Sequence, residues 1–249
     1  MNQTQHNKQE LVQFLLKIAD SDIILSQRLC ELCGKAPALE EEMALMNIAL
    51  DLVGQARNWY EYACVLNPNL VTPDTLVYRR DAHEYRNLLI TEQPNGDFAH
   101  TMARQFFYDV WHYYTLEELT TSSDERLAEI AAKSLKEVTY HLRRSTAWVL
   151  RLGDGTEESH ARMQAAIEEM WRFTGELTQA NSAITKTANL AAQWHAKVAE
   201  VLSTATLKLP PEDAWMHYGS QEGVHTEHLG FILAEMQFLP RAYPDATTW

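Results

Sequence analysis

Apolar residues recur every three or four positions over long stretches of the chain, which is the spacing of helices that bury one face. Nowhere do apolar and polar residues alternate over a length sufficient for a sheet strand. The expected helices cover about 8–33, 39–67, 98–120, 122–153, 157–177, 189–204 and 226–239. We therefore predict an all-α protein.

Local signals place the ends of these helices. Gly34 follows the first helix, at a position where glycine commonly ends one. Thr72-Pro73-Asp74 predicts a helix start, and Ser122 with Glu125 predicts a capping box that opens the fourth long helix. The four longest of the expected helices each exceed twenty residues. Long helices with short connections predict a single domain over residues 1–249, built as a long four-helix bundle with extra helices.

Acidic residues dominate the charge, because 34 aspartates and glutamates against 21 lysines and arginines give a net charge of -13. This balance argues against nucleic-acid binding, which needs clustered basic residues. No run of 18 apolar residues predicts a membrane span, and the polar segment Met1–Gln9 is unlike a secretory signal. Three cysteines do not build a disulfide framework. We therefore expect a cytoplasmic protein that binds neither nucleic acid nor membrane.

A long four-helix bundle is also the scaffold of di-iron carboxylate proteins. Their ligands are a Glu from each of two helices and a Glu-x-x-His pair from each of the other two. The sequence holds four acid-x-x-His pairs, which is more than its composition predicts by chance. Three of them fall at helix starts or in turns, and only Asp109/His112 lies inside an expected helix. The literal motif therefore does not supply a di-iron site.

The inward-facing positions of the second and fourth helices lead to the same expectation. Leu52/Gln55 and Val138/His141 stand where the two Glu-x-x-His pairs would belong. Leucine and valine cannot coordinate a metal, and glutamine is a weak neutral donor. We therefore expect a degenerate di-iron site, with no metal and no catalytic residue in this chain. Its vacated positions are Leu52, Gln55, Val138 and His141.

Four polar residues keep a second hypothesis open. Asp22, Asp109, His112 and His141 could serve an autonomous metal-dependent oxidase. The competing interpretation takes Asp109/His112 as a buried polar contact and His141 as a hydrogen-bonded core histidine. A third hypothesis is a homo-oligomeric storage or scaffold protein.

Two further features admit more than one interpretation. Cys30 and Cys33 form a CxxC motif, but zinc needs two more ligands and a redox pair usually follows a strand. Because this pair ends a helix, a structural role is favoured. The aromatic residues of 106–114 are too many for one core-facing stripe. They predict either burial on every side or a second face against a partner chain, and we favour the partner.

Charged clusters are equally ambiguous. His225 and His228, with Glu222 or Glu227, could form a metal site at i,i+3 spacing. The favoured alternative is a helix start that carries an acid in its first turn. Arg79-Arg80 is expected to be an exposed basic pair that could meet an acidic partner surface or the phosphates of coenzyme A.

Seven strings spread from about residue 20 to the C-terminus resemble one protein family. They are Leu25–Leu29, Leu50–Asn58, Glu92–Gly96, Lys136–His141, Trp171–Thr174, His225–Gly230 and Ala234–Gln237. Together these strings are specific. The sequence resembles the C-type subunits of the bacterial phenylacetyl-CoA epoxidases, also called phenylacetate-CoA oxygenases. In that family the C-type subunit is the non-catalytic, ferritin-like partner of a di-iron catalytic subunit.

The resemblance implies a cytoplasmic complex for phenylacetate catabolism that inserts one oxygen atom from O₂ into the aromatic ring of phenylacetyl-CoA. The catalytic subunit would hold the di-iron cofactor, and this chain would keep it in its working shape. The two would form a heterodimer or a dimer of heterodimers, joined by a further, small subunit of the epoxidase and supplied with electrons by a reductase. Gly54-Gln55 stands where a catalytic relative would carry Gly-His, in agreement with the vacated positions.

The resemblance also implies contacts to the coenzyme A thioester from the segment before Glu-Gln-Pro-Asn-Gly. These residues are Glu84, Tyr85, Arg86 and Asn87. Lys186, an isolated basic residue further along the chain, is the expected contact to a phosphate.

Overall fold

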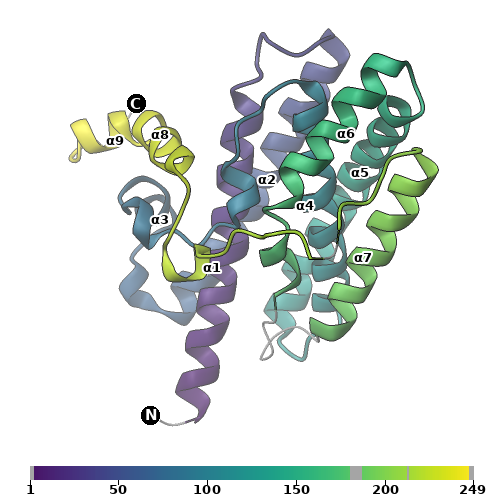
Figure 1. The fold of residues 1–249 in the computed structure, drawn as a ribbon. Helices are drawn as coiled ribbons and strands as arrows, with labels where there is room; N and C mark the ends of the chain where they lie inside the picture. Colours follow the sequence, from purple (N-terminus) through teal and green to yellow (C-terminus); the bar gives the residue numbers. More distant parts are fainter. Residues whose placement is uncertain (1–2, 180–186, 212, 247–249) are drawn as a thin grey trace. The chain divides into compact units, whose positions relative to one another are not determined.

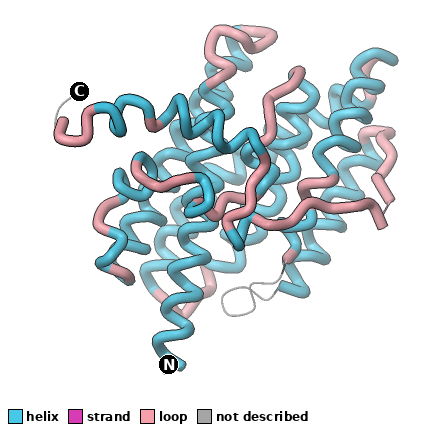
Figure 2. The backbone as a smooth tube through the Cα atoms, turned by 60° about the vertical axis from the view of Figure 1, so that its left-hand side comes forward, coloured by secondary structure: helices cyan, strands magenta, loops and turns pink. Residues whose placement is uncertain are grey.

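A computed structural model describes residues 3–179, 187–211 and 213–246 of the 249-residue chain. Figure 2 shows helices joined by loops, with no strand in the ranges described. The all-α prediction is therefore confirmed.

The helices follow the order expected from the apolar pattern. The α-helices are α1 (Gln3–Cys30), α2 (Leu39–Leu66), α3 (Pro73–Tyr78), α4 (Phe98–Leu119), α5 (Glu125–Gly153), α6 (Glu157–Trp171), α7 (Thr187–Thr204), α8 (Glu227–Met236) and α9 (Phe238–Ala242). Short 3₁₀ helices are η1 (Pro68–Leu70), η2 (Ala82–Glu84), η3 (Leu89–Glu92), η4 (Gly175–Thr178) and η5 (Ser220–Glu222). With 28, 28, 22 and 29 residues, α1, α2, α4 and α5 are the four long helices that were expected.

Two of the predicted helix starts have different outcomes. Thr72 caps α3, because its hydroxyl accepts a hydrogen bond from the backbone N–H of Thr75. The capping box at Ser122 is wrong. The carboxylate of Asp124 caps α5 instead, by accepting from the backbone N–H of Leu127, so the helix begins two residues later than a Ser122 cap requires.

Three predicted helices end three or more residues earlier than expected, and the first of them stops at Cys30 instead of residue 33. The helix expected to reach residue 177 stops at Trp171, and a 3₁₀ turn follows it. The helix expected over 226–239 is divided into α8 and α9 at Gln237. Pro240 explains this break, because its ring would clash with the carbonyl four residues earlier in a continuous helix.

The chain divides into two compact units, and each is described by itself. Unit 1 comprises residues 1–92 and 219–249, and unit 2 comprises residues 93–218. In unit 1, α1 packs along α2, and α8 contacts α1 (Figure 1). In unit 2, α4 packs against α5, α6 and α7. The single domain over 1–249 stays a prediction.

Aromatic side chains form much of the core of unit 2. The ring of Phe107 on α4 lies 5.8 Å from that of Trp171 and 5.7 Å from that of Trp194. The Trp194 indole N–H donates to the carbonyl of Phe107 at 3.0 Å. Every residue from Thr101 to His112 is buried, which covers more than three turns of α4. Residues 106–112 are therefore buried in this chain, whereas Tyr113 and Tyr114 are half-buried, and a partner-facing side of 106–114 stays a prediction.

Candidate functional site

The four vacated positions lie in the interior of the two units. Leu52 and Gln55 on α2 are 0% and 1% exposed, and Val138 and His141 on α5 are both 0% exposed. Burial of these positions follows from the apolar stripes on their helices, as the sequence predicted. The structure thus shows Leu52 and Val138 as apolar side chains sealed from solvent, and their assignment to the carboxylate positions of two Glu-x-x-His pairs stays a prediction.

The residues at these positions do not fit a di-iron centre. Two adjacent iron ions need carboxylates that bridge them and neutralise their charge. The buried side chains of Leu52 and Val138 offer hydrocarbon instead, and hydrocarbon cannot supply a lone pair. Only His141 among the four is an ordinary iron ligand.

Asp109 is a buried carboxylate of unit 2. The Gln105 amide donates to its Oδ1 at 2.7 Å, and the Ser145 hydroxyl donates to its Oδ2 at 2.7 Å. Burial raises the pKa of Asp109 to about 6, although nearby His141 and these two hydrogen bonds act in the opposite direction. The hydrogen-bond partners stand one turn away on α4 and across on α5, so the carboxylate joins two helices.

His112 lies on the same helix in an aromatic environment. Its ring centroid lies 5.2 Å from that of Tyr108 and 5.9 Å from that of Trp111. Burial, together with His141, lowers the pKa of His112 to about 3, which keeps the imidazole neutral. The carboxylate of Asp109 is directed to Gln105 and Ser145, an arrangement that favours the buried polar contact over a catalytic dyad.

The second hypothesis requires Asp22 to join three residues of α4 and α5. Asp22 is fully buried on α1 in unit 1, whereas Asp109, His112 and His141 belong to unit 2. Within residues 3–179, 187–211 and 213–246, no three histidine, cysteine, aspartate or glutamate side chains gather as a metal site requires.

The CxxC motif lies at the end of α1. Cys30 is the last residue of that helix, Cys33 follows in a turn, and both are exposed free thiols. Burial of part of its surface raises the pKa of the Cys30 thiol, which disfavours the reactive thiolate. This placement supports the structural interpretation.

His225 is committed to hydrogen bonds. Its Nδ1 lies 3.0 Å from Glu92 and its Nε2 lies 3.1 Å from the carbonyl oxygen of Tyr85. Burial lowers the pKa of His225, but the hydrogen bond and charge of Glu92 outweigh it, so the net pKa is raised. An imidazole with both nitrogens engaged in hydrogen bonds does not bind a metal, and the helix start at Thr226 is the interpretation that the structure supports.

The segment expected to contact the thioester is mostly turned inward. Tyr85 and Asn87 are 0% exposed, and the Asn87 amide donates to Glu92 at 3.0 Å. Glu84 is exposed and Arg86 is half-buried, so these two remain accessible to a ligand. Lys186 lies outside the described residues. The contacts to coenzyme A stay a prediction.

Two polar centres of unit 1 were not predicted. Glu92, which is 0% exposed, accepts hydrogen bonds from the side chains of Asn87 and His225 and from the backbone and hydroxyl of Thr226. Asp20, also 0% exposed, forms an ion pair with Arg80. The expectation that Arg80 is exposed is wrong, because only 10% of its side chain is accessible.

The surroundings of Arg80 explain its burial. Its guanidinium lies 4.3 Å from the ring centroid of Tyr85, and the Tyr60 hydroxyl donates to Asp20 at 2.5 Å. Local sequence patterns do not predict this ion pair, because Arg80 and Asp20 are 60 residues apart.

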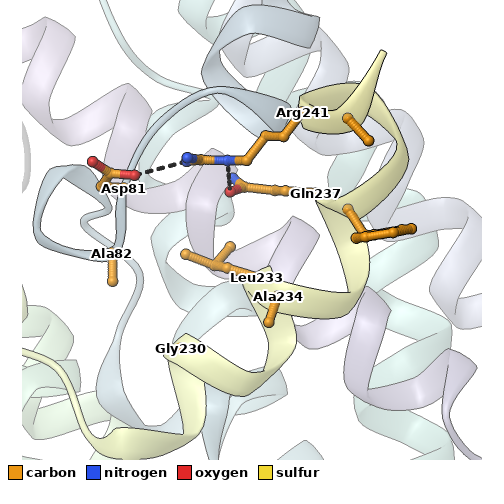
Figure 3. Close-up of a pocket in the computed structure, with 9 residues that line it drawn as sticks. Asp81, Ala82, Gly230, Leu233, Ala234, Gln237 and Arg241 are labelled. Carbon is orange, nitrogen blue, oxygen red and sulfur yellow. Dashed lines mark hydrogen bonds and ion pairs between the residues drawn. The ribbon is translucent and has the colours of Figure 1, made fainter. Parts of the chain in front are cut away.

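A groove of about 520 Å³ lies beside this network in unit 1. Figure 3 shows Arg241 at its rim, where the guanidinium donates to Asp81 at 2.8 Å and to Gln237 at 2.9 Å. Gly230, Leu233 and Ala234 of α8 form an apolar wall. The groove is lined by Asp81 and Ala82, not by the segment 84–87.

No helix in the described part of the chain is both long enough and apolar enough to span a membrane.

Comparison with known proteins identifies the family. A family model described as "Phenylacetic acid catabolic protein" matches residues 1–249. The C-type subunit of the 1,2-phenylacetyl-CoA epoxidase of Escherichia coli (strain K12) is 47% identical over 244 residues, which cover 94% of this chain and 98% of the relative. These matches confirm the resemblance carried by the seven strings, and the all-helical fold is consistent with the ferritin-like helical bundle of the family. The chain belongs to the phenylacetic acid catabolic protein family.

Proposed function

We propose that this chain is a non-catalytic structural subunit of a multicomponent phenylacetyl-CoA epoxidase. It stabilises a di-iron catalytic subunit, which inserts one oxygen atom from O₂ into the aromatic ring of phenylacetyl-CoA. Support comes from the family match over residues 1–249 and from the name of the Escherichia coli relative, which is the C-type subunit of such an epoxidase. The name of that relative as a subunit supports an assembly of several chains. We propose that a further, small subunit and a reductase complete this assembly.

One observation carries the non-catalytic role. Leu52 and Val138, which we assign to the carboxylate positions of the two Glu-x-x-His pairs, are fully buried hydrocarbon side chains. Replacing a buried ionised carboxylate by a well-packed apolar side chain avoids its desolvation and stabilises a fold. With Leu52 and Val138, this chain would gain a stable apolar core at the positions where a catalytic relative carries metal ligands.

The free thiols agree with a reducing compartment. Cys30, Cys33 and Cys64 are free, and cytoplasmic proteins keep their cysteines in that state. We infer that the complex works in the cytoplasm.

Reconstitution with purified components tests the proposal. Iron is measured separately in this chain and in the catalytic subunit, and epoxidation of phenylacetyl-CoA is measured with the reductase, with and without this chain. We expect iron in stoichiometric amount only in the catalytic subunit, and turnover that falls when this chain is omitted. About two iron ions per copy of this chain, or turnover by this chain with reductant alone, would refute the structural role.

Two variants separate the structural role from the autonomous oxidase. His141→Ala and Asp109→Asn remove candidate ligands from unit 2. If the chain is structural, each reconstituted complex keeps the turnover of the wild type once the variant is shown to fold and to bind the catalytic subunit. If the chain is an oxidase, both variants lose turnover while their binding to the catalytic subunit is unchanged.

A further inference from the structure

Helix α2 has a second apolar stripe on the side away from its core. Leu39, Met43, Leu50 and Val53 are 69%, 59%, 69% and 39% exposed, and Met46 between them is half-buried. The intervals between the five residues are four, three, four and three, which is the spacing of a seam that receives another helix. We refer to these five residues as the α2 seam.

A glycine stands beside this seam without a reason in the chain itself. Gly54 lies inside α2, where glycine destabilises a helix relative to alanine. It is exposed, and a Cβ atom built on it meets no heavy atom within 4 Å. Packing within the chain therefore does not require this glycine. A neighbouring helix that approaches the backbone closely would require it.

The seam leads into a groove in unit 1. A cavity of about 400 Å³ lies between α2 and α3, and Val53 and Ala56 of α2 form one wall with Tyr60. Val77 and Tyr78 of α3 form the opposite wall. An apolar stripe continued by a pocket is the surface that an amphipathic helix with a terminal anchor side chain occupies.

The charges around the seam select the partner. Glu40, Glu41 and Glu42 surround its first turn, and Glu61 and Asp74 lie at the rim of the groove at the other end. The acidic residues in the first turn also interact favourably with the dipole of α2, but that effect does not extend to Glu61 and Asp74. Arg57 lies 2.8 Å from Glu61, so it offsets one of these charges. Acidic groups at both ends favour a basic partner, and a net charge of -13 disfavours a second copy of this chain.

We propose that the α2 seam binds an amphipathic helix of a different chain, one that carries lysine or arginine beside its apolar stripe. This inference rests on the proposed function, because the di-iron catalytic subunit is the chain expected to supply that helix. The seam contributes the apolar contact, Gly54 permits a close approach, and the acidic ends fix the register of the partner helix.

Variants of α2 test this surface, with the purified catalytic subunit serving as the probe. Leu50→Asp places a charge in the middle of the seam, and we expect at least about tenfold weaker binding. Val65→Asp is the matched control, because Val65 is 74% exposed on the same helix but outside the seam, and we expect its affinity to stay within about twofold of the wild type. Circular dichroism of both variants checks that each remains folded.

Gly54→Ala supplies a readout that a role in folding alone would not produce. Alanine favours the helix, so the melting temperature of the isolated chain should rise by about 1–3 °C. The same change should weaken the binding of the catalytic subunit, since the new methyl group lies at the contact. Hydrogen exchange along residues 39–57 should slow on complex formation, and binding should weaken with added salt.

Each outcome has a distinct meaning. If the wild-type chain does not bind the catalytic subunit, the proposed function fails and this inference fails with it. If the wild type binds and Leu50→Asp binds equally well, only the assignment of the seam is overturned. If the wild type alone forms a dimer that Leu50→Asp disrupts, the seam is an interface between copies, and the inference is likewise overturned.

Discussion

Replacing Glu92 with glutamine removes a buried charge on which four hydrogen bonds converge. Two of these bonds come from Thr226, at 2.6 Å from its backbone N–H and 2.7 Å from its hydroxyl. The other two come from Asn87 and from His225, both at 3.0 Å. A glutamine amide has one acceptor oxygen and one NH₂ donor group, so its NH₂ group must face either the Thr226 donors or the Asn87 and His225 side.

The expected loss of stability follows from the burial of the pair. Glu92 has a side chain that is 0% exposed and His225 one that is 4% exposed. Breaking a buried ion pair on one side typically costs about 3–5 kcal/mol, and His225 can lower this cost by releasing its proton. We therefore expect Glu92→Gln to lower the free energy of unfolding by about 2–4 kcal/mol at pH 6.

The pH dependence has a definite sign. The pKa of His225 is raised in the folded state, so its contribution is fully present below the pKa of an unfolded histidine, about 6.5. That contribution is lost as the pH rises through the folded pKa. The difference in unfolding free energy between the wild type and Glu92→Gln should therefore shrink between pH 6 and pH 9.

Urea unfolding followed by far-ultraviolet circular dichroism measures the difference at each pH, and hydrogen exchange of the Thr226 amide reports the local opening. Glu222→Gln is the control, because Glu222 is an exposed acid in the same unit and its loss should change the stability by less than about 0.5 kcal/mol. Equal costs of Glu92→Gln at pH 6 and pH 9, or a cost as small as that of the control, would refute the assignment of this buried pair.

Three further substitutions probe the interior of the two units. Asp109→Asn should stabilise the chain by about 1–3 kcal/mol at pH 8, because the folded pKa of Asp109, about 6, lies above its pKa in the unfolded chain. This advantage should disappear as the pH falls from 6 to 4. Urea unfolding at each pH will show whether the stabilities of the variant and the wild type converge. Val138→Glu should lower the free energy of unfolding by about 3 kcal/mol or more, while Ala132→Glu on the exposed side of α5 should leave it nearly unchanged. Equal thermal stability of the two variants would contradict the buried placement of Val138. Arg80→Leu should lower the free energy of unfolding by about 3 kcal/mol, because it leaves Asp20 buried without its cation. The control Arg79→Leu removes an exposed hydrogen bond to the carbonyl oxygen of Pro244 and should lower that free energy by less than about 1 kcal/mol in the same assay.

The order of the helices could be predicted because its determinants are local. Apolar spacing, a cap such as Thr72, and proline or glycine at a boundary lie within one or two turns of the feature that they specify. One error arose where two local signals competed. Ser122 and Asp124 are both good caps, and only the structure shows that Asp124 forms the hydrogen bond to Leu127.

The burial of Leu52, Gln55, Val138 and His141 was also accessible to sequence reasoning, because periodicity shows which residues of α2 and α5 face inward. Of the two hydrogen-bond partners of Asp109, only one could be predicted from the sequence. Gln105 stands four residues earlier on the same helix, a spacing that predicts contact, but Ser145 lies 36 residues away on another helix. Glu92 and His225 are separated by 133 residues, so no local pattern relates them. Long-range polar pairing is what the sequence alone does not give.

The structure also explains what the recognisable strings of this sequence do. Arg28, in the first string, donates to the carbonyl oxygen of Glu92 at 3.0 and 2.7 Å. Glu92 opens another string, and its carboxylate receives His225 and Thr226 from a third. Three separated strings thus meet in one hydrogen-bonded centre of unit 1, in which the carboxylate of Glu92 is committed to holding the chain together. Likeness in these three strings therefore predicts the fold of unit 1, whereas the proposed loss of metal chemistry rests on Leu52 and Val138, whose place as replaced ligands stays a prediction.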